Sequence, residues 1–462
     1  MRRLGKSMKV NAFVAMAGLM LQAPAAHARL LDSFVVMAPE GAEARAVVDD
    51  ATCPALTLDG AQVPMSARAA PATLPARASD SGSAASHPSA FPHLLCSAHL
   101  PRSAHTASLA GQALPLAPAV VRRIVVVGDT GCRLKAGKIG KDGTRSEDAW
   151  QDCNRASAWP FAQVARSAAA LHPDLVLHVG DYLYRESACP AHGADCADTP
   201  WGYGEDAWRA DFLTPARTLL AAAPWVLVRG NHEDCMRAGQ GWWRLLDPHA
   251  LVPGTDCVRE AEDFAGNHAD PYAVELGDGA RIIVADFAAI GEKHLQGPEL
   301  LRYRTDALAI AGLAKPGDVN FVTSHYPFSA VTISGKKGLK IGYPSVDDAF
   351  GGQHPPALPH VTAMIAGHVH LLQVVQPRNA PFQLVNGFSG TQEQEPKAPL
   401  NLADLEALAA GEQAGIAMTD IATRFGQFGF STLDRQADGS WLLIARDVNG
   451  KKLLRRIIQP RP

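Results

Sequence analysis

Long apolar runs rich in β-branched residues recur along the chain from residue 122 onward. The runs are RIVVVGD (123–129), DLVLHVGD (174–181), WVLVRGN (225–231), RIIVADF (281–287), NFVTSH (320–325) and TAMIAGH (362–368). Their apolar positions are continuous rather than alternating, which is typical of strands buried on both faces. The pattern therefore predicts central strands of a sheet that is covered on both sides.

Stretches with a helical spacing of apolar residues lie between these runs. The stretch WPFAQVARSAAALHP (159–173) separates the first two runs, and residues 206–223 and 299–314 have a similar pattern. Alternation of strands and helices predicts the α/β fold class. Near the C-terminus, further apolar segments are interrupted by Asp438-Gly439 and Asn449-Gly450, which favour hairpin turns.

The segment between residues 29 and 118 has a different pattern. Short apolar stretches at 33–38 and 55–58 are separated by turn residues, which predicts short strands. Residues 70–90 are rich in Ala, Pro and Ser and are typical of a loop or linker, and HLLCSAHL (93–100) can return to the same unit. We expect residues 29–118 to form either a small β-type domain or a mobile arm, and residues 119–462 to form the main domain.

The first 28 residues have the pattern of a secretory signal peptide. Four basic residues precede an apolar stretch at 10–21 and the small-residue segment APAAHA, so that cleavage is expected after Ala28. The apolar stretch is shorter than the roughly 20 residues that span a bilayer, and a retained N-terminal anchor is the alternative. We therefore expect a periplasmic or secreted protein.

Cleavage at this point makes the chain more acidic. It removes four basic residues and no acidic residue, which changes the formal net charge from −3 to −7. A mildly acidic chain lacks the basic surface that binds nucleic acid or anionic membranes. We expect neither partner for the mature protein, and any phosphate must bind at a local site.

The cysteines also agree with export. The chain has 8 cysteines, all after residue 28 and none in a CxxC pair, at positions 53, 96, 132, 153, 189, 196, 235 and 257. An even number in an exported chain favours disulfides, and eight cysteines allow 105 pairings. We expect sequential pairing (Cys53–Cys96, Cys132–Cys153, Cys189–Cys196 and Cys235–Cys257), with free buried thiols as the alternative.

Residues that bind metals follow five of the predicted buried strands. They are Asp129, Asp181, Asn231 with His232, His325, and His368 with His370. Because ligand sites in open α/β sheets gather at the carboxyl ends of strands, these side chains are expected to converge. Carboxylates mixed with imidazoles suit Fe, Zn or Mn. One such residue after a strand is more often part of a turn, but five in order make coincidence a poor explanation.

The chain resembles the metallophosphoesterase (calcineurin-like) superfamily and, within it, the purple acid phosphatases. The five sequence blocks of that family occur in order as GDTG (128–131), GDYLY (180–184), GNHE (230–233), VTSH (322–325) and GHVH (367–370). The resemblance covers roughly residues 122–390. It implies a two-sheet β-sandwich flanked by helices, with residues 119–462 as the catalytic domain and the N-terminal strands as an addition.

The resemblance implies a specific set of ligands. Relatives use Asp-x-His in the first block, whereas purple acid phosphatases use Asp-x-Gly and a tyrosine three residues after the second Asp. This chain has both features, in Gly131 and Tyr184. The alternative is that Tyr184 is an ordinary core or rim aromatic, as its neighbour Tyr182 is expected to be.

Two metal ions follow from this set. The first ion is expected at Asp129, Asp181, Tyr184 and His370. The second is expected at Asp181, which bridges, and at Asn231, His325 and His368. A phenolate favours Fe(III), and the neutral Asn231 favours a divalent Fe, Zn or Mn ion at the second position.

The resemblance implies a dinuclear-metal phosphatase that hydrolyses small-molecule phosphate monoesters at acidic pH, and the signal peptide adds that the enzyme is exported. His232 is expected to stabilise the transferred phosphoryl group or protonate the leaving oxygen, oriented by Glu233, although simple packing is the alternative. A phosphodiesterase or nucleotidase of the same superfamily is the second hypothesis. A secreted binding protein on the same scaffold and a peroxide-active iron protein are further hypotheses, and the oligomeric state is left open.

The chain also departs from plant purple acid phosphatases. These carry a further histidine pair about ten residues beyond the position of His325, where this chain has YPFSAVTISGKKGLK without histidine. The candidates to replace the pair are Lys336, Lys337, His354 and His360, all of which are equally compatible with solvated loop positions. The segments WGYGEDAW (201–208) and GQGWWRLL (239–246) supply aromatics either for a pocket wall or for the core.

Overall fold

The structure of the chain is a computed structural model. It describes residues 29–79, 86–137, 146, 148–190, 193–334, 338–353, 356, 358–392 and 418–461. The predicted signal peptide (1–28), Lys336, Lys337 and His354 lie outside the described residues.

A large sheet forms the first half of the molecule, with strand order β27-β26-β25-β11-β14-β15-β1-β2-β8-β5. Its strands are β1 (Arg29–Ala38), β2 (Gly41–Asp49), β5 (Ser66–Ala69), β8 (Leu94–Leu100), β11 (Arg123–Val127), β14 (Leu175–His178), β15 (Trp225–Leu227), β25 (Gly429–Arg435), β26 (Trp441–Asp447) and β27 (Lys452–Ile458). The central strands β11, β14, β15 and β1 run parallel to their neighbours in this group.

A second sheet has the strand order β16-β17-β18-β21-β23-β22-β24. Its strands are β16 (Tyr272–Gly277), β17 (Ala280–Val284), β18 (Val319–Thr323), β21 (Val361–Ala366), β22 (Leu372–Pro377), β23 (Phe382–Asn386) and β24 (Met418–Arg424). The strands β17, β18, β21 and β23 are parallel. All six predicted buried strands are therefore present, as β11, β14, β15, β17, β18 and β21.

The two sheets pack face to face, and alternate residues of each strand explain the continuous apolar runs. Ile124 and Val126 of β11 lie in one buried cluster with Ile282 and Phe321 of the second sheet. The intervening residues of β11 point the other way and pack under helices. Both faces of the strand are therefore buried, as the sequence pattern predicted.

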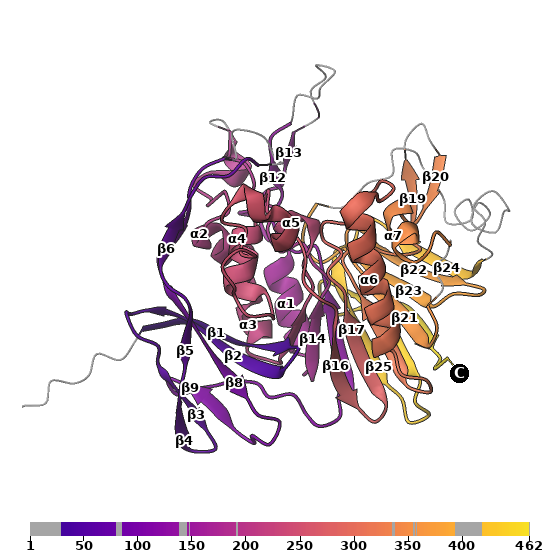
Figure 1. Cartoon of the computed structure of the whole chain (residues 1–462), viewed down its shortest axis with the longest axis horizontal. Helices are drawn as coiled ribbons and strands as arrows, with labels where there is room; N and C mark the ends of the chain where they lie inside the picture. The colour runs from indigo at the N-terminus through magenta and orange to yellow at the C-terminus, as the bar shows by residue number, and fades with distance from the viewer. Residues whose placement is uncertain are drawn as a thin grey trace, which may run out of the picture.

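Helices cover the outer face of each sheet, which gives a helix–sheet–sheet–helix arrangement (Figure 1). On the first sheet, Val125 lies in one buried cluster with Val164 of α1 and Leu219 of α3. On the second sheet, Ile283 lies in one buried cluster with Ile310 of α6. This confirms the predicted α/β sandwich. The helices are α1 (Phe161–Ala169), α2 (Glu205–Trp208), α3 (Thr214–Leu220), α4 (Gly239–Gly241), α5 (Asp263–Gly266), α6 (Gly297–Leu313) and α7 (Pro344–Ala349).

The N-terminal segment continues the first sheet. Val36 of β1 pairs with Trp225 of β15, and β2, β8 and β5 follow in antiparallel order. A smaller sheet, β10-β9-β3-β4, consists of β3 (Ala55–Leu58), β4 (Ala61–Pro64), β9 (Ala107–Leu109) and β10 (Gln112–Ala113). The predicted loop at 70–90 contains an antiparallel pair, β6 (Ala72–Leu74) with β7 (Ser89–Phe91), because Leu74 and Phe91 are buried against the main core.

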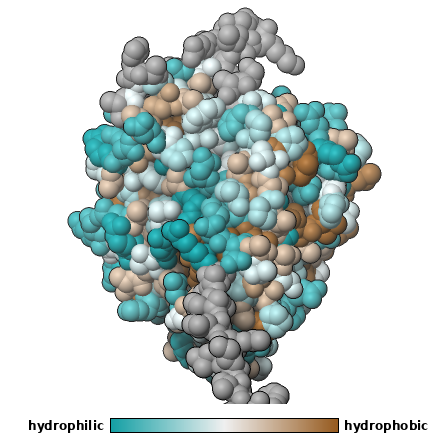
Figure 2. Space-filling model, turned by 90° about the vertical axis from the view of Figure 1, so that its left-hand side faces the viewer, coloured by the Kyte–Doolittle hydropathy of each residue, from teal (hydrophilic) through white to brown (hydrophobic). Residues whose placement is uncertain are grey.

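One side of the molecule presents many polar residues (Figure 2). Figure 2 shows the side of the molecule that lies on the left of Figure 1, where hydrophilic residues cover much of the middle of the face. Among the described residues, the exposed large apolar side chains are Met236, Val252, Phe264, Leu301, Leu308 and Ile457. Within the same residues, no helix is both long and apolar enough to cross a membrane.

All eight cysteines form disulfides, in the sequential pairing that we expected. The bonds are Cys53–Cys96, Cys132–Cys153, Cys189–Cys196 and Cys235–Cys257. The first lies in the N-terminal segment. The second and third lie together in one small buried cluster around Leu134 of β12 (Leu134–Lys135), which pairs with β13 (Ala149–Trp150). The alternative of free thiols is excluded.

Candidate metal centre

The polar residues that follow the parallel strands meet where the two sheets face each other. Asp129, Asp181 and Asn231 follow β11, β14 and β15, which are neighbours in the first sheet. His325 follows β18, and His368 with His370 follows β21, which is the neighbour of β18 in the second sheet. Each sheet thus contributes its carboxyl edge to one shared site.

The backbone at this edge is bent in a way that side chains rarely tolerate. Asp129, Asp181 and His368 have positive φ angles of 53°, 60° and 70°. A non-glycine residue in this left-handed region costs of order 1 kcal/mol or more. Three of the predicted ligands accept this conformation, which turns their side chains toward the site.

Glycines beside the ligands allow the close approach of neighbouring segments. A Cβ atom on Gly230 would lie 2.1 Å from Oδ1 of Asp181, and one on Gly367 would lie 2.5 Å from Oδ2 of Asp129. A Cβ on Gly131 would lie 2.7 Å from the carbonyl oxygen of Tyr182 and 2.8 Å from the backbone nitrogen of Tyr184. A histidine cannot occupy position 131, because the loop that brings in Tyr184 fills its place.

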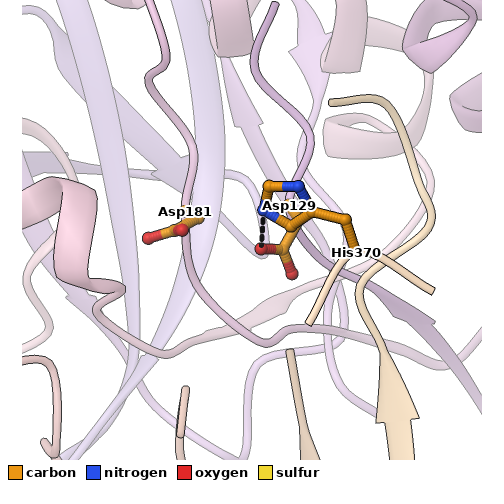
Figure 3. A group of neighbouring side chains, drawn as sticks. All are labelled: Asp129, Asp181 and His370. Carbon is orange, nitrogen blue, oxygen red and sulfur yellow. Dashed lines mark ion pairs between the residues drawn. The ribbon is translucent and has the colours of Figure 1, made fainter. Parts of the chain in front are cut away.

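One group of donor atoms surrounds the Tyr184 hydroxyl. Its oxygen lies 2.5 Å from Oδ2 of Asp181, 2.9 Å from Nε2 of His370 and 3.2 Å from Oδ1 of Asp129. Nε2 of His370 lies 3.4 Å from the same Asp129 oxygen, and Figure 3 shows this ion pair with Asp181 beside it. Donors that share an ion at about 2.0–2.2 Å lie roughly 2.8–3.6 Å apart, so these atoms have nearly the spacing of a coordination shell.

A second group shares Asp181 with the first. Nε2 of His325 lies 3.2 Å from Oδ2 of Asp181 and 3.1 Å from Oδ1 of Asn231. The same Asn231 oxygen lies 2.9 Å from Nδ1 of His368. One oxygen, Oδ2 of Asp181, is therefore next to donors of both groups. The structure brings together all seven residues that were predicted as ligands, and their arrangement fits two ions bridged by Asp181.

Backbone carbonyls orient two of the three histidines, His325 and His370. Nδ1 of His325 lies 2.8 Å from the carbonyl oxygen of Val179, and Nδ1 of His370 lies 2.9 Å from that of Gln392. A ring that donates its Nδ1–H to a carbonyl presents a lone pair on Nε2, as metal-binding histidines usually do. The donor chemistry thus fits a metal as well as the spacing does.

Burial and neighbouring charges shift the pKa values of several residues of the site. Burial opposes ionisation of Asp181, but the His325 and His232 rings outweigh it and hold the pKa of Asp181 well below its usual value. Burial and the charges of Asp181 and Asp129 raise the pKa of the Tyr184 phenol well above its usual value. Burial lowers and Asp181 raises the pKa of His325, to about 9. Protons thus hold the charge balance of the metal-free site, and bound cations would displace them.

His232 lies over the first donor group and is held by Glu186. Nδ1 of His232 lies 2.8 Å from Oε1 of Glu186, and the His232 ring lies 3.9 Å from the Tyr184 ring, centroid to centroid. Burial lowers the pKa of His232 to about 4, against the opposing charge of Glu186. Glu186 was not predicted from the sequence, because nothing in the local pattern distinguishes a carboxylate five residues after Asp181.

Glu233 has a different position from the one we expected. Its carboxylate accepts hydrogen bonds from the backbone N–H groups of Asp181, Tyr182, Leu183 and Gly230, at 2.9–3.1 Å, and does not contact His232. Burial and the Asp181 charge raise its pKa to about 8. The prediction that Glu233 orients His232 was wrong, because the Glu233 side chain turns back into the loop that carries Asp181.

The other candidates lie away from the site or in the core. His360 is exposed and lies at the start of β21, at the opposite end of this strand from His368. Trp208, Trp242 and Trp243 are buried in the main core, which favours core packing over a pocket wall for these residues.

A cavity of about 480 Å³ opens beside the second donor group. Asn231, Tyr326, Phe264 and Arg302 are among the residues that line it. The sequence pattern had not indicated this cavity, because its walls come from segments far apart along the chain.

Comparisons with known proteins agree with the fold. A family model described as calcineurin-like phosphoesterase matches residues 122–372, whereas no curated protein matches the sequence. The solved structure of a purple acid phosphatase from yellow lupin (Lupinus luteus) seeds aligns over 94% of this chain and 74% of its own, with a TM-score of 0.56 and 14% sequence identity.

Two further solved structures align less closely. A structure of PhoD aligns over 94% of this chain and 92% of its own, with a TM-score of 0.46 and 11% identity. A dimetal phosphatase from Danio rerio aligns over 74% of this chain and 100% of its own, with a TM-score of 0.38 and 13% identity. Of these three structures, only the lupin purple acid phosphatase has a TM-score, 0.56, high enough to indicate a shared fold.

Proposed function

The chain belongs to the calcineurin-like phosphoesterase family, and we propose that it is an exported phosphatase that hydrolyses phosphate monoesters at two metal ions in acidic surroundings. Membership makes it a metal-dependent phosphoric ester hydrolase. The observation that carries the finer proposal is the pair of donor groups that share Oδ2 of Asp181, one of which contains the Tyr184 hydroxyl.

The donors divide by charge, and this division supports the choice of metals. Asp129, Asp181, Tyr184 and His370 offer three oxygens that can be anionic, which suits a trivalent ion such as Fe(III). The other group adds only neutral donors to Asp181, namely Asn231, His325 and His368, which suits divalent Fe, Zn or Mn. When bound, two such ions supply an activated water and neutralise the phosphoryl oxygens.

His232 is the residue of the chain best placed to act on the ester itself. Its Nδ1 is held by Glu186, which leaves Nε2 free to face the site, 4.0 Å from Oδ2 of Asp181. From this position the ring can donate a hydrogen bond to the transferred phosphoryl group or a proton to the leaving oxygen. Glu186 holds the ring at one orientation, and Glu233 fixes the loop that carries Asp181.

Export is the remaining part of the proposal. Residues 1–28 have the pattern of a signal peptide, and the four disulfides suit the periplasm or the extracellular space. A trivalent ion lowers the pKa of a bound water further than a divalent ion does, which supports the acidic optimum.

The test combines a metal analysis with two substrates. We expect about two metal ions per chain, a broad visible band from tyrosinate and Fe(III), and faster hydrolysis of nitrophenyl phosphate than of bis(nitrophenyl) phosphate, with an acidic optimum. Faster hydrolysis of the diester would replace the monoesterase by a phosphodiesterase. A colourless protein with two divalent ions would retain the reaction and remove the Fe(III) assignment and the reason for acid activity.

A further inference from the structure

A second group of side chains that can bind a metal lies outside the candidate metal centre. It consists of an imidazole and two carboxylates, on His268, Asp270 and Asp306. One donor atom of each residue lies within 4.8 Å of the donor atoms of the other two. None of the three residues belongs to the donor groups described above, so this group is a separate feature of the molecule.

The group joins two segments that are far apart along the chain. His268 and Asp270 lie between α5 and β16, and Asp306 lies in the middle of α6. Nε2 of His268 is 3.1 Å from Oδ1 of Asp306 and 3.0 Å from Oδ2. Donors that share a zinc ion at about 2.0–2.2 Å lie roughly 2.8–3.6 Å apart. The ring and the Asp306 carboxylate therefore already have the spacing of a coordination shell.

The negative charge of Asp306 is only partly balanced. Its side chain is 4% exposed, and among the described residues only His268 hydrogen bonds to its carboxylate. Burial raises the pKa of Asp306, and the charges of Asp286 and Asp270 add to this rise, although the contact with His268 opposes it. Buried carboxylates are stable when they are paired or bind a metal, and a divalent cation would supply the missing positive charge.

Asp270 can supply the third donor from the solvent side. The residue is exposed, and none of the described residues donates a hydrogen bond to its carboxylate. Its main chain is held, because His249 hydrogen bonds to the Asp270 backbone. The limit of 4.8 Å is wider than a closed coordination shell, so the exposed carboxylate has to turn inward when an ion binds.

We propose that His268, Asp270 and Asp306 bind a zinc ion at a site separate from the candidate metal centre, with water at the fourth position. An imidazole and two carboxylates are ligands that zinc accepts in tetrahedral sites. Calcium and magnesium prefer oxygen ligands alone, so the imidazole favours zinc over these ions. The two carboxylates balance the charge of the ion. This site does not depend on the phosphatase function.

The ion has a structural role, because it cross-links α6 to the segment that follows α5. Asn267 precedes His268 directly, and Tyr303 lies one turn before Asp306 in α6. Both residues line the cavity of about 480 Å³ beside the second donor group. The zinc ion thus fixes two walls of this cavity relative to each other. It stabilises the folded chain, because the three ligands come together only after folding.

The first test counts zinc ions in the metal-bound full-length protein after equilibrium dialysis against zinc chloride. We expect the wild-type protein to hold one zinc ion per chain more than Asp270→Ala, in which the affinity should fall at least tenfold. Glu40→Ala is the matched control, since Glu40 is an exposed carboxylate in the turn between β1 and β2. Equal zinc contents in the wild-type protein and in Asp270→Ala would overturn the proposal.

The second test measures the thermal midpoint with and without zinc. At a hundredfold excess of zinc over its dissociation constant, the midpoint of the wild-type protein and of Glu40→Ala should rise by about 3 °C. Asp306→Asn, which keeps a polar partner for His268, and Asp270→Ala should show no rise. A rise of the same size in all four proteins would place the zinc elsewhere and contradict the site.

Hydrolysis of nitrophenyl phosphate separates the zinc site from the phosphatase function. Asp270→Ala should have the turnover of the wild-type protein, because Asp270 lies outside both donor groups. If neither protein hydrolyses the ester but the difference of one zinc ion is found, the zinc site stands and the phosphatase function fails. If both hydrolyse it and their zinc contents are equal, the phosphatase function stands and the zinc site is wrong.

Discussion

Tyr184 is the residue on which the nature of the first metal position depends. Its hydroxyl lies within 3.2 Å of donor atoms from Asp129, Asp181 and His370. Tyr182, two residues earlier, is buried as well, but its hydroxyl donates to the carbonyl oxygen of Val228 at 3.0 Å. The two tyrosines thus form a natural matched pair, one inside the donor group and one outside it.

The substitution Tyr184→Phe should remove the visible band and lower the metal content toward one ion per chain. Turnover should fall by at least about 10²-fold, because even partners of ligands contribute 10–100-fold. Tyr182→Phe should keep the metals, the spectrum and the turnover, and should lower only the thermal midpoint. Metal analysis and an absorption spectrum of the two variants are the measurement. A Tyr184→Phe protein with an unchanged spectrum would show that another residue produces the band.

Glu186 and Glu233 are both buried carboxylates near His232, and the structure gives them different effects. Glu186→Gln keeps an acceptor for the ring but removes the charge, so it should lower kcat by about tenfold while KM and metal content change little. Glu233→Gln places an amide N–H against backbone donors and should cost about 2 kcal/mol or more of unfolding free energy. Steady-state kinetics with urea unfolding of both variants would decide. A loss of kcat in Glu233→Gln without loss of stability would restore the earlier assignment.

At the scale of elements, the segment after α4 ends in the pair of Asp247 and His249, whose contribution to the free energy of unfolding depends on pH. Nδ1 of His249 lies 3.0 Å from Oδ1 of Asp247, with 25% and 2% of the two side chains exposed. Burial opposes both ionisations, but the contact between the two outweighs it, raising the pKa of His249 and lowering the pKa of Asp247. The pair therefore holds this segment most firmly when both groups are charged.

The sign of the effect follows from the two shifts. Because the pKa of His249 is raised in the folded protein, its contribution to the free energy of unfolding is fully present below the unfolded pKa of about 6.5. This contribution is lost as the pH rises through the folded pKa. Because the pKa of Asp247 is lowered in the folded protein, its contribution to the free energy of unfolding is present above the unfolded pKa of about 3.9. This contribution is lost as the pH falls through the folded pKa. The free energy of unfolding of the wild-type protein should exceed that of His249→Gln by up to about 1 kcal/mol near pH 5. This difference should vanish by about pH 9. Urea unfolding at both pH values measures it, and a difference independent of pH would contradict the assignment.

The strands and main helices could be predicted because their sequence patterns report local burial. The run 123–129 became β11, residues 299–314 lie almost entirely within α6, and the turns at Gly439 and Gly450 have the positive φ of 83° that glycine favours. The order of the strands could not be predicted, since β25 pairs with β11 from more than 300 residues away. Hydrophobic periodicity indicates which faces are buried but not which strand lies next to which.

The candidate site divides in the same way. All seven predicted metal ligands come together, because each follows a strand and the carboxyl ends of parallel strands meet at one edge. The partner of His232 and the cavity at Phe264 depend on side chains that fold back from other segments. Glu233 is next to His232 in the chain whereas Glu186 lies in the segment after Asp181, and only the structure shows that Glu186 is the one that contacts the ring.

At the scale of the whole molecule, the N-terminal segment shares its core with the catalytic domain. Phe34 and Phe91 lie in the same buried cluster as Trp242 and Trp243. Arg68 donates to the carbonyl oxygens of Trp243, Arg244, Asp247 and His249, and Arg45 donates to those of Leu245 and Asp247. The boundary at residue 119 stays a prediction, and these contacts suggest how it can be tested.

We expect the chain 119–462 to be unstable without residues 29–118. Removal of residues 29–118 leaves the edge of β15 without β1 and exposes the apolar residues that pack against Trp242 and Trp243. It also removes Arg68, which donates hydrogen bonds to backbone carbonyl groups of the main domain. The measurement is the thermal midpoint of the truncated chain beside that of 29–462, with Arg102→Ala as a matched control because Arg102 is exposed. Adding residues 29–118 as a separate chain should restore part of the stability, since β1 can pair with β15 again. A truncated chain with the midpoint of the longer one would instead make the N-terminal segment an independent domain or arm.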